Sequence, residues 1–265
     1  KYIMRDKLDR FYTPHSSAEY CINTIENIKD YDLIIEPSAG SGSFSNLIPE
    51  CLAYDIAPQN DTIITQDYLE LEKLPEHNKM LVIGNPPFGT RSTLAKKFIK
   101  HSINLGASTI AFILPQTFKK YTNQTMFNSD WRLVTVSNIP DDNFLLEETT
   151  IHIPCSFFVW TKLEDYKPLT NLRDIKQSPA QEFTFLPRED TRADFTINGN
   201  NGKTKNISNI TNSKAEHYIK VNPDYNVDTI RKQLDTIDFE IVSSVNGGVA
   251  WLGQNDILRH WHNRN

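Results

Sequence analysis

The sequence is poor in cysteine and lacks any long apolar run. Its three cysteines, Cys21, Cys51 and Cys155, do not have the close spacing of metal ligands, and their odd number fits a reducing compartment. No apolar stretch approaches the roughly 18 residues that a membrane-spanning helix requires, and no signal peptide is visible. We therefore expect no disulfide framework, no bound metal and no membrane partner, and we expect a cytoplasmic or otherwise intracellular protein.

The sequence also lacks an excess of positive charge, since the formal net charge is −5 over 265 residues. This argues against a chain that coats nucleic acid with its whole surface, so any contact with phosphates has to depend on a local basic region. The densest such region, 92–120, contains five lysines and no acid, namely Lys96, Lys97, Lys100, Lys119 and Lys120. It could serve phosphates, but a solvated helix face is an equally good explanation.

The first 162 residues alternate short apolar runs with polar turns, a pattern typical of an α/β domain with a mostly parallel sheet. We expect one catalytic domain at 1–162 and a small appendage at 163–265, which contains a helix at 227–237. The acidic segment 140–153 is a predicted lid or recognition loop. The runs predict strands at 33–35, 52–56, 62–69, 80–83 and 109–114, helices at 92–105 and 116–127, and closing antiparallel strands at 131–138 and 154–161.

A glycine turn follows the first predicted strand. It begins at the acidic residue Glu36, passes through Pro37, Ser38, Gly40 and Gly42, reaches Phe44, and is predicted to lead into a short helix. This order is typical of a nucleotide-type loop. The turn lacks the Gly-Lys-Ser/Thr of a phosphate-binding loop and the third glycine of a dinucleotide fingerprint. An acid at this place favours a cationic or amino-bearing ligand over a pyrophosphate.

Acidic residues also follow the next two predicted strands. Asp55 ends the second strand, where a carboxylate in doubly wound folds accepts hydrogen bonds from ribose hydroxyls. Asp67 ends the third strand. Taken singly, each acid could be a solvated loop charge, but three acids in corresponding positions favour a shared binding site.

The N-terminal stretch Phe11-Tyr12-Thr13-Pro14 precedes Ser16 and Glu19, which have capping-box spacing. The stretch is therefore predicted to be a turn at a helix N-terminus, a place suited to a carboxylate. The alternative is a well-capped helix without a ligand.

The stretch Gly84-Asn-Pro-Pro-Phe-Gly89 dominates the pattern. It follows the apolar run 80–83, and two prolines end that strand in a stiff turn at the carboxyl edge of the sheet, where open α/β sheets bind ligands. The oxygen of Asn85 and the carbonyl of Pro86 can each accept one hydrogen of an NH2 group, while Phe88 can stack on a planar ring. A plain proline turn is the alternative.

In this order, the motifs over residues 9–162 resemble those of S-adenosylmethionine-dependent N6-adenine methyltransferases with the gamma-like motif order. The resemblance implies a Rossmann-like class I methyltransferase fold, with a seven-stranded, mostly parallel sheet and helices on both faces. It implies catalytic roles for Asn85, Pro86, Pro87 and Phe88. The implied contacts with the cofactor S-adenosylmethionine are Tyr12, Thr13 and Pro14 on its methionine part, the loop Glu36 to Phe44, Asp55 and Ile56 at the ribose, Asp67 and Tyr68 at the adenine, and Asn85.

The implied substrate is the N6 amino group of adenine in DNA. Phe88 stands where many DNA enzymes have tyrosine and also occurs in RNA-adenine enzymes, so RNA is the second possibility. A protein glutamine, whose amide also presents an NH2 group, is third, and a catalytically inactive nucleic-acid-binding relative is fourth. The appendage is too small for a typical large target-recognition domain, which leaves recognition of a short site by segment 140–153 together with residues 163–265, or help from a partner subunit. The recognition sequence, and a restriction, phage or solitary role, stay open.

Overall fold

The computed structural model describes residues 11–139, 143–146, 149–152, 154–163, 170–239, 241 and 251–264. The chain divides into two compact units, unit 1 (1–173) and unit 2 (174–265). This boundary lies beyond the one drawn from the sequence because residues 172 and 173 are tied to unit 1. The N–H of Leu172 donates to the carbonyl of Leu133, and the Arg173 guanidinium donates to backbone carbonyls of Gln124, Phe127, Asn128 and Trp131.

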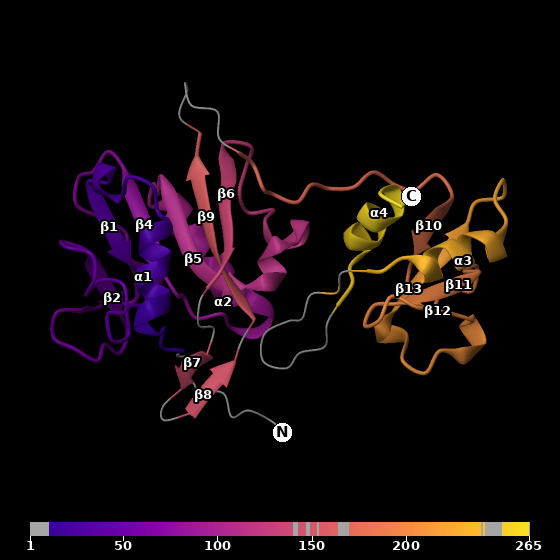
Figure 1. Ribbon diagram of the computed structural model, residues 1–265, viewed down its shortest axis with the longest axis horizontal. Coiled ribbons are helices and arrows are strands. Elements are labelled where there is room, and N and C mark those ends of the chain that lie inside the picture. The colour runs from indigo at the N-terminus through magenta and orange to yellow at the C-terminus, as the bar shows by residue number, and fades with distance from the viewer. Residues whose placement is uncertain are drawn as a thin grey trace. The chain divides into compact units, whose positions relative to one another are not determined.

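Unit 1 is built on a seven-stranded sheet with the order β3-β2-β1-β4-β5-β9-β6 (Figure 1). Neighbours from β3 to β5 pair in parallel, whereas β9 lies between β5 and β6 and is antiparallel to both. This is the strand order of class I methyltransferases, so the predicted Rossmann-like fold is confirmed. The strands are β1 (Leu33–Glu36), β2 (Leu52–Asp55), β3 (Ile64–Thr65), β4 (Met80–Gly84), β5 (Thr109–Pro115), β6 (Trp131–Asn138) and β9 (Cys155–Lys162).

The burial of these strands follows their place in the sheet. Every residue of β4 and β5 is buried, as expected for central strands covered on both faces. Both residues of the edge strand β3 are exposed. This strand is much shorter than the predicted 62–69, because Asp67 accepts a hydrogen bond from the N–H of Leu69 and starts a 3-10 turn.

Unit 1 contains the helices α1 (His15–Thr24) and α2 (Thr93–Asn104). The predicted capping box is wrong, because α1 begins before Ser16 and its N-cap, Pro14, has no side-chain cap. The predicted helix at 116–127 is also wrong, since this segment forms two 3-10 turns, Gln116–Lys119 and Tyr121–Asn123. The Gln124 amide donates to the carbonyls of Phe118 and Lys119 and so replaces helical bonding.

Segment 140–153 was predicted to be a lid or recognition loop. Its described parts pair as an antiparallel hairpin of β7 (Asn143–Leu146) and β8 (Thr149–His152). The remainder of this segment lies outside the described residues, as do Asp9 and Arg10 at the start of the resemblance. No described helix is both long and apolar enough to cross a membrane.

Unit 2 has its own antiparallel sheet and core. The strand order is β10-β13-β11-β12, with α3 (Val227–Thr236) and α4 (Gln254–His262) contributing apolar side chains. Its core includes Phe183, Phe195, Ile219, Leu234 and Trp261, all of which are at most 1% exposed. The strands are β10 (Phe183–Leu186), β11 (Phe195–Asn198), β12 (Thr204–Lys205) and β13 (Glu216–Val221).

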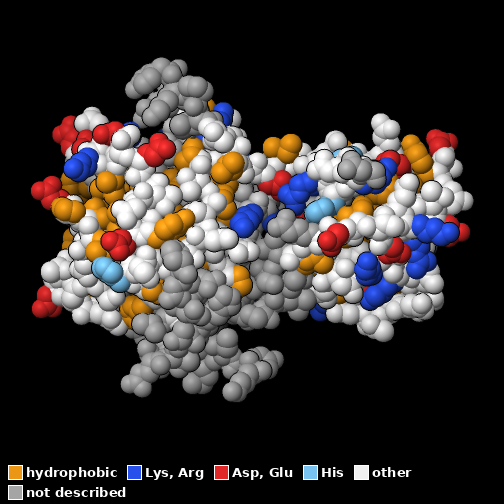
Figure 2. All heavy atoms as spheres, viewed as in Figure 1, with side chains coloured by type: hydrophobic (Ala, Val, Ile, Leu, Met, Phe, Trp, Pro, Cys, Tyr) orange, Lys and Arg blue, Asp and Glu red, His pale blue; other side chains and the backbone are white. Residues whose placement is uncertain are grey.

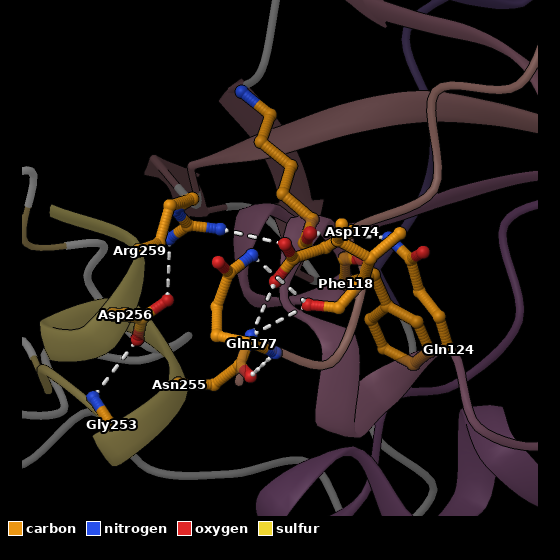
Figure 3. Close-up of polar contacts among 10 residues, drawn as sticks. Phe118, Gln124, Asp174, Gln177, Gly253, Asn255, Asp256 and Arg259 are labelled. Carbon is orange, nitrogen blue, oxygen red and sulfur yellow. Dashed lines mark hydrogen bonds and ion pairs between the residues drawn. The ribbon is translucent and has the colours of Figure 1, made fainter. Parts of the chain in front are cut away.

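A polar cluster ties α4 to the first residues of unit 2 (Figure 3). The Arg259 guanidinium forms ion pairs with Asp174 at 2.9 Å and with Asp256 at 2.6 Å. Asp256 also accepts the N–H of Gly253, and the Asn255 side chain accepts the N–H of Gln177. These contacts hold the first residues of unit 2 against α4 of the same unit.

Charge is dispersed over the face drawn in Figure 2, where Lys and Arg side chains are scattered singly over unit 1. The lysines of the predicted basic stretch are divided between α2 and the turns after β5. Burial and the charge of Lys100 lower the pKa of Lys96. Because three of the five lysines lie on α2 and the other two lie after β5, the predicted basic stretch is not a single element.

Candidate active site

A cavity of about 390 Å³ opens at the carboxyl ends of β1, β2 and β4. Five parts of unit 1 line it: the N-terminal turn, the glycine loop, the residues after β2 and β3, the turn after β4, and α2. The predicted site residues in its lining are Tyr12, Thr13, Glu36, Pro37, Ser38, Gly40, Asp55, Ile56, Asp67, Tyr68, Asn85 and Pro87. The predicted residues Pro14, Gly42, Phe44, Pro86 and Phe88 are not among the lining residues.

Glu36, the last residue of β1, is the buried acid of the site and is 1% exposed. Its two carboxylate oxygens accept the N–H groups of Phe44 at 3.3 Å and Ser45 at 2.7 Å. Burial raises its pKa to about 7 although these hydrogen bonds oppose the shift. The carboxylate thereby folds the glycine loop back on the end of β1, and the loop continues in turns instead of the predicted short helix.

The glycine loop depends on backbone conformations that favour glycine. Gly40 and Gly42 have φ angles of +56° and +86°. A Cβ atom on Gly40 would lie 3.0 Å from Cε1 of Tyr12, which is tighter than ordinary contact. The glycine therefore allows both the turn and the approach of the Tyr12 ring.

Asp55, at the end of β2, fixes the loop from the other side. Its Oδ2 accepts the N–H of Gly40 and its Oδ1 accepts the N–H of Ala57, both at 2.8 Å. The side chain of Ile56, beside it, is 54% exposed although it is apolar. A carboxylate beside an open apolar side chain suits a ligand that combines hydroxyl groups with a planar ring.

Asp67 and Tyr68 form the wall beyond β3. Tyr68 is 1% exposed, its hydroxyl forms a 2.9 Å hydrogen bond with Ser102, and its ring stacks on Phe98 with centroids 5.7 Å apart. Burial raises the pKa of Tyr68 above its usual range, so the phenol stays neutral. Leu94 and Phe98, one helical turn apart on α2, also line the cavity and were missed in the sequence. The sequence does hold a signal for them, because Leu94 and Phe98 form an apolar face on the helix that was noted only for its lysines.

Asn85 follows β4 and has a fixed side-chain amide. Its Nδ2 donates to the carbonyl of Phe11 and to Oγ1 of Thr13, each at 3.1 Å. Its Oδ1 is buried and has no hydrogen-bond partner among the described residues. A buried acceptor without a partner is costly in a folded protein, so this oxygen is suited to a ligand donor.

The ring of Phe88 is not open to the cavity. Phe88 is 2% exposed, and its ring stacks on that of Phe11 with centroids 6.0 Å apart and an interplanar angle of 23°. The sequence predicts that Phe88 offers a face to a planar substrate, but in the structure Phe11 covers that face. Phe11 itself lines the cavity.

The chain leaves the turn through an unusual backbone. Arg91 and Ser92 both have positive φ angles, 53° and 58°, directly before α2. Non-glycine residues rarely adopt this conformation, which costs about 1–3 kcal/mol per residue and is often found at functional sites.

The described residues contain no group of three or more His, Cys, Asp or Glu side chains that could hold a metal ion.

Unit 1 is similar to methyltransferase domains. Residues 27–155, slightly less than half of the chain, match the family model described as the EDM2 methyltransferase-like domain. No curated protein matches. Among solved structures, a proposed RNA methyltransferase, PH1948, from Pyrococcus horikoshii is 14% identical, with 62% of this chain and 93% of that chain covered and a TM-score of 0.46. The N-methyltransferase NodS from Bradyrhizobium japonicum WM9 is 12% identical, with 57% of this chain and 94% of that chain covered and a TM-score of 0.37.

These two solved structures are too distant to bear on the substrate. The fold assignment depends instead on the strand order of unit 1. Residues 27–155 of unit 1 are thus similar to a methyltransferase-like domain, and the strand order of unit 1 is that of class I methyltransferases.

Proposed function

We propose that this chain transfers a methyl group from S-adenosylmethionine to the N6 amino group of adenine in DNA. The observation that carries the proposal is the buried, unpartnered Oδ1 of Asn85 at the edge of the cavity that Glu36, Asp55 and Asp67 also line. An exocyclic amine of the substrate supplies a donor for this acceptor.

The lining residues fit the cofactor. Asp55 and Ile56 would hold its ribose, Asp67 and Tyr68 its adenine, and Tyr12 with Glu36 its amino-acid part. The buried, acidic Glu36 favours an ammonium group over a phosphate, and the glycine loop allows close approach of a ligand to the backbone. When bound, S-adenosylmethionine supplies a methyl carbon on a sulfonium, which is already a strong electrophile.

The chain's own groups hold the amine. Asn85 Oδ1 and the Pro86 carbonyl each accept one amine hydrogen, which directs the nitrogen lone pair away from the ring and towards the methyl carbon. Both acceptors stabilise the positive charge that develops on the nitrogen. Alignment of the two reactants can supply roughly 7–11 kcal/mol in favourable cases. A strong general base is therefore not required.

DNA is the first choice of substrate, RNA the second and a protein glutamine the third. A base in duplex DNA has to flip out of the stack at a cost of a few kcal/mol, which stacking on an aromatic ring partly offsets. In this chain, stacking on Phe88 also requires that Phe11 moves aside, because the two rings are stacked on each other. A catalytically inactive nucleic-acid-binding relative would have no need for the acids that line the cavity.

Methyl transfer can be tested with radiolabelled S-adenosylmethionine and duplex DNA, single-stranded DNA, RNA or protein as acceptors. Label is expected in DNA, at N6 of adenine after nucleoside analysis. Label found only in RNA or only in glutamine would replace DNA by that substrate, and binding without label in any acceptor would favour the inactive relative.

The role of Asn85 can be tested by substitution. Asn85→Ala should lower turnover at least about 100-fold, the usual effect of losing one preorganised electrostatic contact, with cofactor affinity within a few-fold of wild type. Asp55→Ala is the matched control, because it should weaken cofactor binding first. Near-normal turnover in Asn85→Ala would contradict the assigned role of the turn.

A further inference from the structure

The orientation of the Asn85 amide is set by a segment far away in sequence. Its two partners, Phe11 and Thr13, precede α1, whereas Asn85 follows β4, so 74 and 72 positions separate them. Sequence motifs alone place Thr13 with the cofactor. In the structure Thr13 lines the cavity, and its hydroxyl also lies 3.1 Å from Asn85 Nδ2.

The chemistry of the partners decides which end of the amide faces them. The backbone carbonyl of Phe11 can only accept, so the atom of Asn85 that faces it has to be the NH2 nitrogen. The oxygen of the same planar amide then points away from the segment, and it is this oxygen that is buried without a partner. If the amide rotated by half a turn, two acceptors would face each other, and a substrate amine would meet a donor in place of an acceptor.

Thr13 is itself held in place. It is 8% exposed, and its carbonyl accepts a hydrogen bond from Ser43 Oγ of the glycine loop at 3.2 Å. The next residue, Pro14, starts α1, and its carbonyl accepts the N–H groups of Ser17 and Ala18. Because Thr13 is fixed on both sides, its hydroxyl can hold the Asn85 amide without ordering a free loop.

We propose that Thr13 is a positioning residue for the methyl transfer: its hydroxyl, with the carbonyl of Phe11, holds the Asn85 amide so that Oδ1 faces the amine of the substrate. This inference rests on the proposed function in one respect, namely that the group receiving the methyl is an amine held by Asn85. It gives the threonine a role through Asn85, in addition to or in place of a contact with the cofactor.

Two substitutions in the chain of residues 1–265 separate this role from packing and from cofactor binding. Thr13→Val keeps the shape and removes the hydroxyl, whereas Thr13→Ser keeps the hydroxyl. We expect kcat at saturating S-adenosylmethionine to fall about 10-fold in Thr13→Val, as for the loss of one hydrogen bond, with the cofactor Kd within about 3-fold of wild type. Thr13→Ser should restore most of the lost kcat.

Three outcomes would overturn the proposal. Unchanged kcat in Thr13→Val would show that the hydroxyl is not needed. A raised cofactor Kd with normal kcat at saturation would assign Thr13 to the cofactor alone. Equal losses in Thr13→Ser and Thr13→Val would assign the effect to packing.

A second measurement does not need activity. In the 15N-labelled chain, the side-chain NH2 resonances of Asn85, identified by their absence in Asn85→Ala, should shift and exchange faster with solvent in Thr13→Val but not in Thr13→Ser. Identical resonances in wild type and Thr13→Val would overturn the proposal. If no acceptor is methylated by wild type, the proposed function fails, while this measurement still decides whether Thr13 orients the amide.

Discussion

Single carboxylate side chains at the carboxyl edge of the sheet hold the backbone of the cavity wall in place. Asp55 bonds the N–H groups of Gly40 and Ala57, and Glu36 bonds those of Phe44 and Ser45. These hydrogen bonds shape the cavity before any ligand binds. A site of this kind is preorganised, because its polar groups need little rearrangement on binding.

Glu36 should make stability depend on pH. Its pKa of about 7 in the folded chain exceeds the ordinary value of 4.5, so the folded state holds the proton more tightly than the unfolded state. The stabilisation is full below about pH 4.5 and is lost as the pH rises through 7. Relative to Glu36→Gln, which does not titrate, wild type should lose up to about 3 kcal/mol of unfolding free energy across this range.

Urea denaturation of both proteins at several pH values between 5 and 8 measures this difference. Glu36→Gln has one acceptor oxygen fewer for the two N–H groups, which shifts its stability by an amount that does not depend on pH. A constant difference between the two proteins would contradict the raised pKa.

At the scale of elements, the site is made by segments that meet only in the folded sheet. The N-terminal turn makes three contacts with two of them: Tyr12 packs on the glycine loop at Gly40, while Thr13 bonds Asn85 and Phe11 stacks on Phe88 in the turn after β4. The N-terminal turn is therefore part of the cavity wall and of the support for the turn after β4. Loss of its packing should affect ligand binding as well as stability.

The contact between Gly40 and Tyr12 can be tested with a matched pair of glycines. Gly40→Ala should cost about 1–2 kcal/mol for the left-handed backbone and a further amount for the 3.0 Å approach to Tyr12, and it should weaken cofactor binding. Gly106 has φ +93° but its nearest atom would be 3.8 Å away. Gly106→Ala should therefore show the backbone cost alone, with unchanged cofactor affinity by calorimetric titration. Equal cofactor affinity in both variants would show that the conformation of the glycine loop at Gly40 does not contribute to cofactor binding.

At the scale of the whole molecule, the two units have separate sheets and unit 2 has a core of its own. The end of unit 1 is defined by Arg173, whose guanidinium donates to four backbone carbonyls of the segment 124–131. A fragment that stops earlier loses these hydrogen bonds and leaves carbonyl groups without partners.

We expect the fragment 1–173 to be more stable than 1–162 by about 2 kcal/mol or more, since hydrogen bonds from a charged group contribute about 1.5–3 kcal/mol each. Thermal or urea unfolding of the two fragments measures this. Arg173→Ala in the longer fragment is the control and should bring its stability close to that of the shorter one. Equal stability of the fragments would place the boundary of unit 1 where the sequence suggested.

Much of the fold could be predicted because short, uninterrupted apolar runs report burial directly. The runs at 80–83 and 109–114 became β4 and β5, which are buried along their whole length, and α2 lies within a residue of its predicted ends. The failures occurred where side chains compete with the backbone. Gln124 takes the carbonyls of Phe118 and Lys119, which a helix at 116–127 would need for its own N–H groups, and Asp67 takes the N–H of Leu69 and starts a 3-10 turn within the predicted strand 62–69.

The amino-acid sequence by itself determined the sheet and the list of acids and amides at its carboxyl edge, because strand burial and turn chemistry are local. Only the tertiary structure decided which of these groups face one another. Phe11 covers Phe88, and Thr13 holds the amide of Asn85, through contacts across more than 70 positions of the chain. Such contacts have no local pattern, since they depend on how α1 and β4 are placed in the same fold.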